Sequence, residues 1–209
     1  MLPMFPLQSA LLPGETLPLR IFEPRYSRLV QDCLAAADPV FGVVLISQGR
    51  EVGGGDIRSD VGVLARITDW VEDGPGQYQL VAAAGERIRV TRWMPDDPYP
   101  IAETQLWPDD PGPAVGPDRI GEVVDAVLTL YRRVSDAAGG RLRPDALAVD
   151  AETADDPGRH IYALATRVPM GQADRYAVLS APTLAARVDA LIDAVETVTA
   201  MVEFQLSDE

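Results

Sequence analysis

The stretch Leu17-Pro18-Leu19-Arg20-Ile21-Phe22-Glu23-Pro24-Arg25-Tyr26 decides how the first half of this chain folds. Residues 17–22 are an apolar run of strand length. Pro24 follows at once, and proline suits the first turn of a helix. The two prolines also fix the backbone angles on either side of the junction. The stretch therefore predicts a strand that turns a tight corner into a helix.

The side chains of this corner predict how it is held. Phe22 and Tyr26 are four residues apart and are expected to clamp the corner. Glu23 and Arg25 are expected to pair with one another or with backbone groups, because polar groups at tight corners usually satisfy buried backbone. We therefore interpret Phe22, Glu23, Pro24, Arg25 and Tyr26 as structural in the first instance.

Outward from the corner, the pattern predicts a β-rich region. Strands are expected over residues 4–8 and 41–46, and an apolar stripe at spacings of three and four predicts a helix from Pro24 to about residue 37. Gly53-Gly54-Gly55 predicts a loop over 49–60. Four further strands are expected, over residues 61–71, 77–84, 86–94 and 99–107. A turn at residues 73–76 joins the first two, and a turn near Gly85 joins the second and third, which favours a β-meander.

The periodicity becomes helical after a run rich in proline and glycine. We predict a β-rich lobe over residues 1–110, a connector over 108–117 and an α-helical lobe over 117–209. Helices are expected over 120–134, 158–168, 171–179 and 183–206, with 141–156 irregular. Asp156-Pro157 has the pattern of a helix cap followed by proline in the first turn. The fold class is thus α+β, with a helical bundle after the strands.

The composition excludes several kinds of chemistry. All 18 basic residues are arginine, so the lysine of a phosphate-binding P-loop, a Schiff base or a Ser-Lys dyad is absent. His160 is the single histidine and Cys33 the single cysteine, which is too few for a zinc cluster. We predict no catalytic residues, no metal and no cofactor. The alternative that stays open is a hydrolase that uses carboxylates alone, for which two acids would have to converge in one pocket.

The net charge of −14 restricts the partners. It is shared equally between residues 1–110 and 111–209, and a field of this sign repels phosphate backbones and anionic lipid. We therefore expect no nucleic acid and no membrane as a partner. The N-terminus has no signal-peptide pattern and no apolar run spans a bilayer, so a cytoplasmic location is expected.

Several segments resemble the N-terminal substrate-binding domain of Lon proteases. The corner stretch matches the family's "L-P-L-x-I-F-E-P-R-Y", preceded by Pro3-Met4-Phe5-Pro6-Leu7 and a Pro13-Gly14 turn. Phe41–Leu45, Val61–Ile67 and Gly85–Val90 resemble further family segments, whereas the helical half is similar in layout only. The resemblance implies a PUA-like pseudo-barrel followed by a helical bundle, and it implies recognition of client proteins without cleavage.

The resemblance makes protein clients, or a separate protease or chaperone, the expected partners of an adaptor or regulator. We expect a monomer or a weak homodimer. RNA binding, by analogy with other PUA-like folds, is the further alternative, and the acidic charge argues against it.

Strand alternation predicts a surface for client contact. Residues 61–71 place Val63 and Ile67 on one side, with Arg66 and Trp70 on the other. Residues 86–94 likewise place Arg87, Arg89 and Trp93 opposite the apolar positions, and we expect both polar sides to face solvent. Because Trp and Arg are enriched at binding hot spots, the candidate contact residues are Trp70, Trp93, Arg66 and Arg89.

Overall fold

The chain forms two compact units, Met1–Pro108 and Asp109–Glu209. The computed structural model describes residues 1–48, 57–137, 139–141, 143 and 145–207. The triple-glycine loop predicted at Gly53–Gly55 lies outside the described residues. Residues 57–60, which were expected to continue that loop, belong to a strand.

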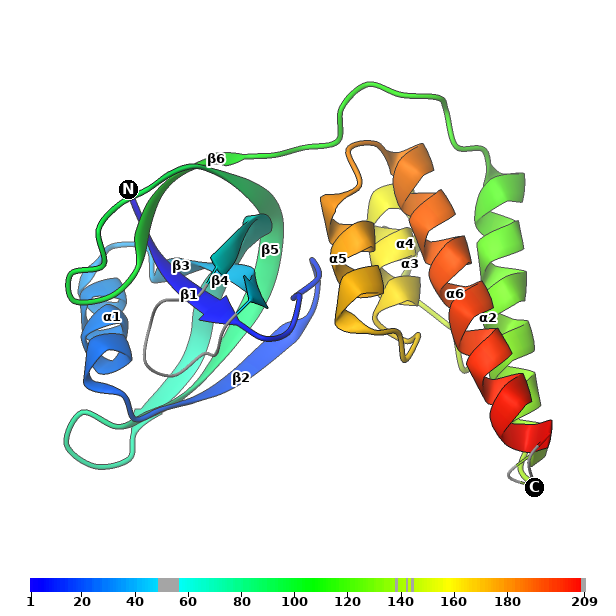
Figure 1. Ribbon diagram of the computed structural model, residues 1–209, viewed down its shortest axis with the longest axis horizontal. Helices are drawn as coiled ribbons and strands as arrows, with labels where there is room; N and C mark the ends of the chain where they lie inside the picture. The colour runs from blue at the N-terminus through cyan, green and yellow to red at the C-terminus, as the bar shows by residue number, and fades with distance from the viewer. Residues whose placement is uncertain (49–56, 138, 142, 144, 208–209) are drawn as a thin grey trace. The chain divides into compact units, whose positions relative to one another are not determined.

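The first unit is a closed barrel of β-strands with one helix (Figure 1). Its strands pair in the order β2-β5-β4-β3-β1-β6, and β6 also pairs with β5. Five strands therefore close on themselves, and β2 extends the sheet beside β5. The elements are β1 (Leu2–Leu7), β2 (Thr16–Ile21), α1 (Pro24–Ala35), β3 (Val40–Gln48), β4 (Ile57–Glu72), β5 (Tyr78–Trp93) and β6 (Ile101–Leu106).

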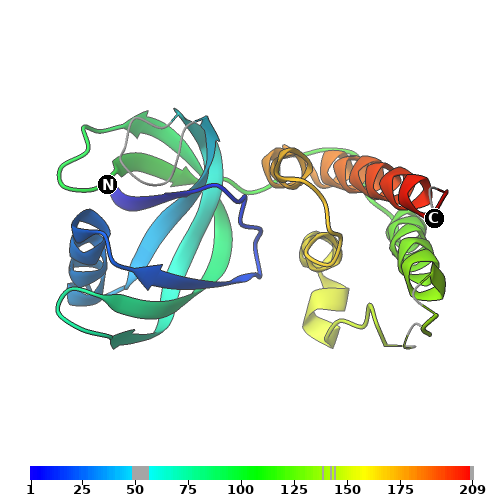
Figure 2. The same cartoon turned by 60° about the horizontal axis from the view of Figure 1, so that its bottom comes forward.

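Apolar side chains fill both faces of the strands. One cluster lies inside the barrel and consists of Met4, Val44, Ile88, Val90 and Ala102. The opposite face packs under α1, where the rings of Phe5 and Tyr26 lie 4.2 Å apart. Figure 2 shows α1 lying along this side of the barrel. Because both faces of these strands are buried, their sequences contain continuous apolar runs and not only alternating apolar and polar residues.

The predicted turn near Gly85 is wrong, because residues 78–93 form the single strand β5. Val63 of β4 pairs with Arg87, but Ala65 pairs with Ala84. Two residues of β5, Gly85 and Glu86, therefore oppose one residue of β4. This is a β-bulge, which bends a strand without ending it, and a glycine in a strand interior often marks such a site.

The second unit is helical, as the 3.6-residue periodicity predicts. In both views α2 (Pro117–Ala137) and α6 (Leu184–Ser207) lie side by side (Figures 1 and 2). The shorter helices are α3 (Ala151–Asp155), α4 (Pro157–Ala165) and α5 (Gln172–Ser180). Asp156 caps α4 by accepting hydrogen bonds from the amides of Gly158 and Arg159. The segment 141–156 was expected to be irregular, but it contains α3. The predicted α+β fold, with a pseudo-barrel and a helical bundle, is confirmed.

The start of the second unit is anchored by a buried arginine. Asp109 accepts a hydrogen bond of 3.1 Å from Arg187, and Arg187 is only 2% exposed. The amide of Asp110 donates to the carbonyl of Pro182. A Cβ added to Gly112 would lie 2.9 Å from the side chain of Thr183. Residues 109–112 therefore pack against the region where α6 begins, and no helix or strand occurs from 108 to 116.

Candidate functional site

The strand-to-helix corner is held by an ion pair and an aromatic stack. Arg25 and Glu23 lie 3.1 Å apart, and the Arg25 guanidinium lies 4.5 Å from the centre of the Tyr26 ring. Tyr26 itself is buried. Pro24 opens α1 at its first position, as expected. The prediction for Phe22 is wrong, because Phe22 is 63% exposed and does not clamp the corner.

The second aromatic residue of interest, Trp70, lies on a different face from the predicted one. Ile67 pairs with Ala82, but Asp69 pairs with Val81, so Thr68 is an extra residue in β4. This second bulge reverses the alternation, and Trp70 pairs with the buried Leu80. Its ring lies 6.2 Å from that of Tyr78, on the face of the sheet that α1 covers. Trp70 is still 48% exposed, because it lies near the end of β4.

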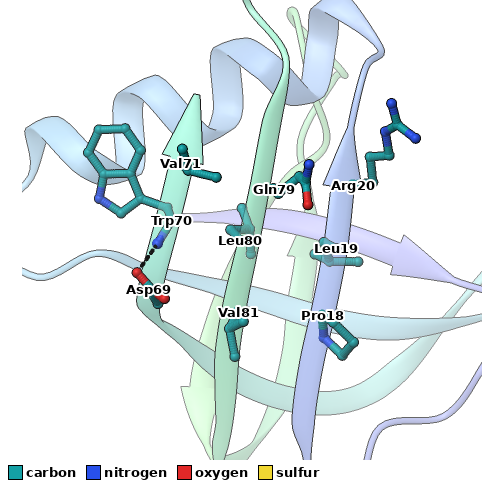
Figure 3. A pocket seen from close by; sticks show the side chains of 9 residues that line it. All are labelled: Pro18, Leu19, Arg20, Asp69, Trp70, Val71, Gln79, Leu80 and Val81. Carbon is teal, nitrogen blue, oxygen red and sulfur yellow. Dashed lines mark hydrogen bonds between the residues drawn. The ribbon is translucent and has the colours of Figure 1, made fainter. Parts of the chain in front are cut away.

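A hollow of about 450 Å³ lies over the ends of β2, β5 and β4, next to Trp70. The strand register places the side chains of Pro18 and Arg20 on one face with Gln79 and Val81 of β5. Asp69 and Val71 of β4 pair with these β5 residues and share that face. Figure 3 shows the lining residues on three neighbouring strands. The hollow therefore combines apolar side chains with one arginine and one carboxylate.

The four predicted contact residues do not form one surface. Trp70 pairs with Leu80 near one end of the β4–β5 ladder, whereas Trp93 pairs with Ala102 at the far end of β5. Trp93 is half-buried against the barrel cluster, and the guanidinium of Arg58 lies 4.9 Å from its ring centre. Arg66 is ion-paired with Asp38.

Two arginines of β5 hold Trp107, near the end of the barrel unit. Arg89 and Arg87 lie 3.8 Å and 4.3 Å from the centre of the Trp107 ring. The expectation that Arg87 faces solvent is wrong, because it is only 5% exposed. Stacked in this way, both side chains stabilise the end of the first unit.

The single cysteine and the single histidine both have perturbed pKa values. Burial raises the pKa of the Cys33 thiol to about 12, and the thiol donates to the carbonyl of Val40. A thiol with such a pKa is not a nucleophile at neutral pH. Burial and the nearby Arg167 lower the pKa of His160. Over the described residues, no three acidic, histidine or cysteine side chains gather in a group that would hold a metal ion.

Sequence reasoning missed the residues that line the hollow, apart from Trp70. The hollow exists because the bulge at Thr68 turns Asp69 and Val71 toward the face that carries Arg20. A bulge of this kind leaves no clear mark on the periodicity of one sequence. No helix in the described part of the chain has the length and apolar character to cross a bilayer.

Comparison with known proteins gives one consistent result. The profile of the ATP-dependent protease La (LON) substrate-binding domain matches residues 1–197. The chain is 26% identical to the Lon protease of Roseiflexus castenholzii over 179 residues, which cover 85% of this chain and 22% of that protein. It is also 26% identical to Lon protease 2 of Sorangium cellulosum, with 89% and 23% covered. The chain thus spans less than a quarter of the length of these relatives.

Solved structures agree with the sequence comparison. A Lon N-terminal domain protein from Xanthomonas campestris has 27% identity and a TM-score of 0.66, with 92% of this chain and 96% of that one covered. The N-terminal domain of Mycobacterium avium complex Lon protease has a TM-score of 0.62 at 15% identity, with 93% and 97% covered, and this likeness supports the fold alone. The chain belongs to the family of the Lon protease substrate-binding domain.

Proposed function

We propose that this chain is a non-catalytic protein-recognition module of the cytoplasm, which binds client or partner proteins as an adaptor or regulator. Membership of a substrate-binding family supports recognition of proteins as its role. The high pKa of the Cys33 thiol argues against this residue as a nucleophile.

The observation that carries the proposal is the exposure of three apolar residues at the end of the sheet where the hollow lies. Phe22, Trp70 and Val71 are 63%, 48% and 55% exposed. Ile21 pairs with Tyr78, and Tyr78 pairs with Glu72, so the register puts all three at the same end of three neighbouring strands. Val71 lies on the face of the hollow and Trp70 on the opposite face, so apolar surface is exposed on both sides of this end of the sheet. Exposed apolar surface of this kind is a feature of interaction sites. Of the four predicted contact residues, Trp70 is the one that we retain.

A binding titration with an unfolded protein tests this function. Reduced and carboxymethylated test protein is labelled, and its affinity for the full chain is measured by fluorescence anisotropy. The variant Trp70→Ser should weaken binding at least about fivefold, which corresponds to roughly 1 kcal/mol. Leu106→Ser is the matched control, since Leu106 is 61% exposed and lies on β6 of the same unit.

The outcomes separate cleanly. Equal affinity of the Trp70→Ser and Leu106→Ser variants would remove this surface from the proposal. No binding of the unfolded protein by the intact chain would overturn the recognition role itself.

A further inference from the structure

One long edge of the barrel unit has no partner strand. Strand β2 pairs with β5 along its whole length, from Thr16 opposite Ala83 to Ile21 opposite Tyr78. It ends the strand order, and within the described residues no other strand pairs with it. In the described part of the chain, each of the five barrel strands has partners on both sides for at least part of its length. A free edge exposes a row of backbone donors and acceptors to which another chain can pair.

Pro18 identifies the backbone groups that point outward. Proline has no amide hydrogen, so in a sheet its nitrogen faces away from the partner strand. Along a strand this direction alternates, and Thr16 and Arg20 therefore present their N–H and C=O groups on the same side as Pro18. Within the described part of the chain, no turn or loop makes a backbone hydrogen bond to these groups. All three residues are exposed.

The hollow lies directly beside this edge. Pro18 and Arg20 contribute to both features, because their backbones form the edge and their residues line the hollow. A strand added along β2 would direct every second side chain to the face that carries the hollow. Val71 and Val81 on that face favour apolar side chains at those positions.

The charge at this end of the sheet selects the polar side chains of the added strand. Asp69, Glu72 and Asp73 lie at this end of β4 and in the turn that follows. They accept hydrogen bonds from the amides of Trp70 and Gly76 and from Gln79, respectively. Over the described residues none of the three forms an ion pair, and all three are exposed. Asp69 lines the hollow, whereas Glu72 pairs with Tyr78 and lies on the opposite face. The three carboxylates therefore make this end of the sheet acidic as a whole, which favours basic residues in a strand added here.

We infer that an extended client segment with alternating apolar and basic residues adds as a new strand on the free edge of β2. This inference rests on the proposed recognition function and specifies its client class and binding mode. Strand addition is a known way for sheets to bind peptides. The net charge of −14 disfavours a second copy of this chain at the same edge, because two acidic edges repel each other.

The first test uses the full chain and synthetic peptides, so that its result does not depend on the folding of a variant. A labelled ten-residue peptide of alternating valine and arginine is compared with one of alternating valine and glutamate, by fluorescence anisotropy. We expect the arginine peptide to bind at least about tenfold more tightly, a difference of roughly 1.4 kcal/mol. The preference should shrink in 0.5 M salt, because salt screens exposed charges.

N-methylation of the peptide backbone separates strand addition from charge attraction. Every second amide of an added strand points toward β2. Methylation of these amides blocks the hydrogen bonds to β2, whereas methylation of the other set of alternate amides leaves them intact. One methylated arginine peptide should therefore bind at least about tenfold more weakly than the other. Hydrogen exchange should show new protection at the amides of Thr16 and Arg20.

A pair of charge variants checks the assignment of the acids. The triple variant Asp69→Asn, Glu72→Gln, Asp73→Asn should lose the preference for the arginine peptide. A control with the same change in net charge, Asp125→Asn, Asp193→Asn, Glu196→Gln, alters exposed acids of the helical unit and should keep it.

Each failure has its own meaning. Binding of unfolded protein without any effect of N-methylation, and without protection of Thr16 and Arg20, overturns strand addition but leaves the recognition function standing. Protection of these two amides on dimerisation alone would show that a second copy uses the edge, which also overturns the inference. If neither peptides nor unfolded protein bind, the recognition function itself fails.

Discussion

The buried ion pair of the helical unit should respond unequally to the loss of either partner. Arg187 is 2% exposed, whereas the side chain of Asp109 is 32% exposed. Asp109→Ala leaves a cation that water cannot reach, and breaking a buried pair in this way costs roughly 3–5 kcal/mol. Arg187→Met leaves a carboxylate that regains water, and methionine retains much of the packing. We expect that variant to lose less than half as much.

Tyr162 strengthens the expectation of a large effect for Asp109→Ala. The guanidinium of Arg187 lies 4.2 Å from the centre of this ring, and the Nε of Arg187 has no hydrogen-bond partner in the structure. The cation thus depends on Asp109 for compensation of its charge. In the double variant, neither charge remains. Its loss of stability should therefore be smaller than the sum of the two single losses by about 1–3 kcal/mol.

The distribution of aromatic residues provides two separate signals for this experiment. Trp70, Trp93 and Trp107, the three tryptophans of the chain, all lie in Met1–Pro108. Tryptophan fluorescence during urea unfolding therefore reports on the barrel unit, and circular dichroism at 222 nm reports mainly on the helices. The Asp109→Ala variant should shift the dichroism transition to lower urea and leave the fluorescence transition nearly unchanged. Equal losses for the two single variants, or a strictly additive double variant, would refute the reasoning.

Three other predictions concern single residues. Because burial raises the pKa of Cys33 to about 12, a thiol reagent at pH 8 should label it only after unfolding, and full labelling of the native chain would contradict its burial. The folded-state pKa of His160 is depressed, so the unfolded state binds more protons below the ordinary value of 6.5, and stability should fall as the pH drops below it. His160→Gln should lessen this fall in urea titrations at pH 7.5 and pH 5, and an unchanged fall would exclude His160 as its source. A Cβ on Gly62 would lie 2.0 Å from the carbonyl of Val43, so Gly62→Ala should unfold the barrel. Gly121 in α2 has open space around it, so Gly121→Ala should raise the stability of the helices by about 0.5–1 kcal/mol in the same urea titration. If Gly62→Ala were instead the more stable of the two variants, the strand register at Gly62 would be wrong.

The sequence was informative wherever local physics decides the structure. The corner at Pro24, the cap at Asp156 and the helices of the second half depend on residues within a few positions of one another, so their pattern is visible in the chain. The family resemblance added the closure of the barrel, which no local pattern contains. That closure depends on β6 pairing with both β1 and β5, which are far away in sequence.

The errors at Trp70 and at Gly85 share one cause, which is the β-bulge. Alternation predicted that Trp70 would lie beside Arg66, but the extra residue at Thr68 moves the indole to the other face of the sheet. At Gly85 the pattern predicts a turn where the structure has a bulge, because a glycine between two apolar runs is typical of both. Phe22 was placed at the corner because of its spacing from Tyr26, but the ring of Phe5 fills that position instead.

The same bulge that defeats the sequence pattern also builds the candidate site. Without the extra residue at Thr68, Asp69 and Val71 would lie on the opposite face from Pro18 and Arg20. The hollow would then have neither its carboxylate nor one of its apolar walls. Deletion of Thr68 should therefore restore simple alternation in β4 and abolish binding of the arginine peptide, while the closed barrel of five strands still forms. Bulges are found more often next to functional sites than elsewhere in sheets. Deletion of Thr68 should therefore remove recognition without preventing folding.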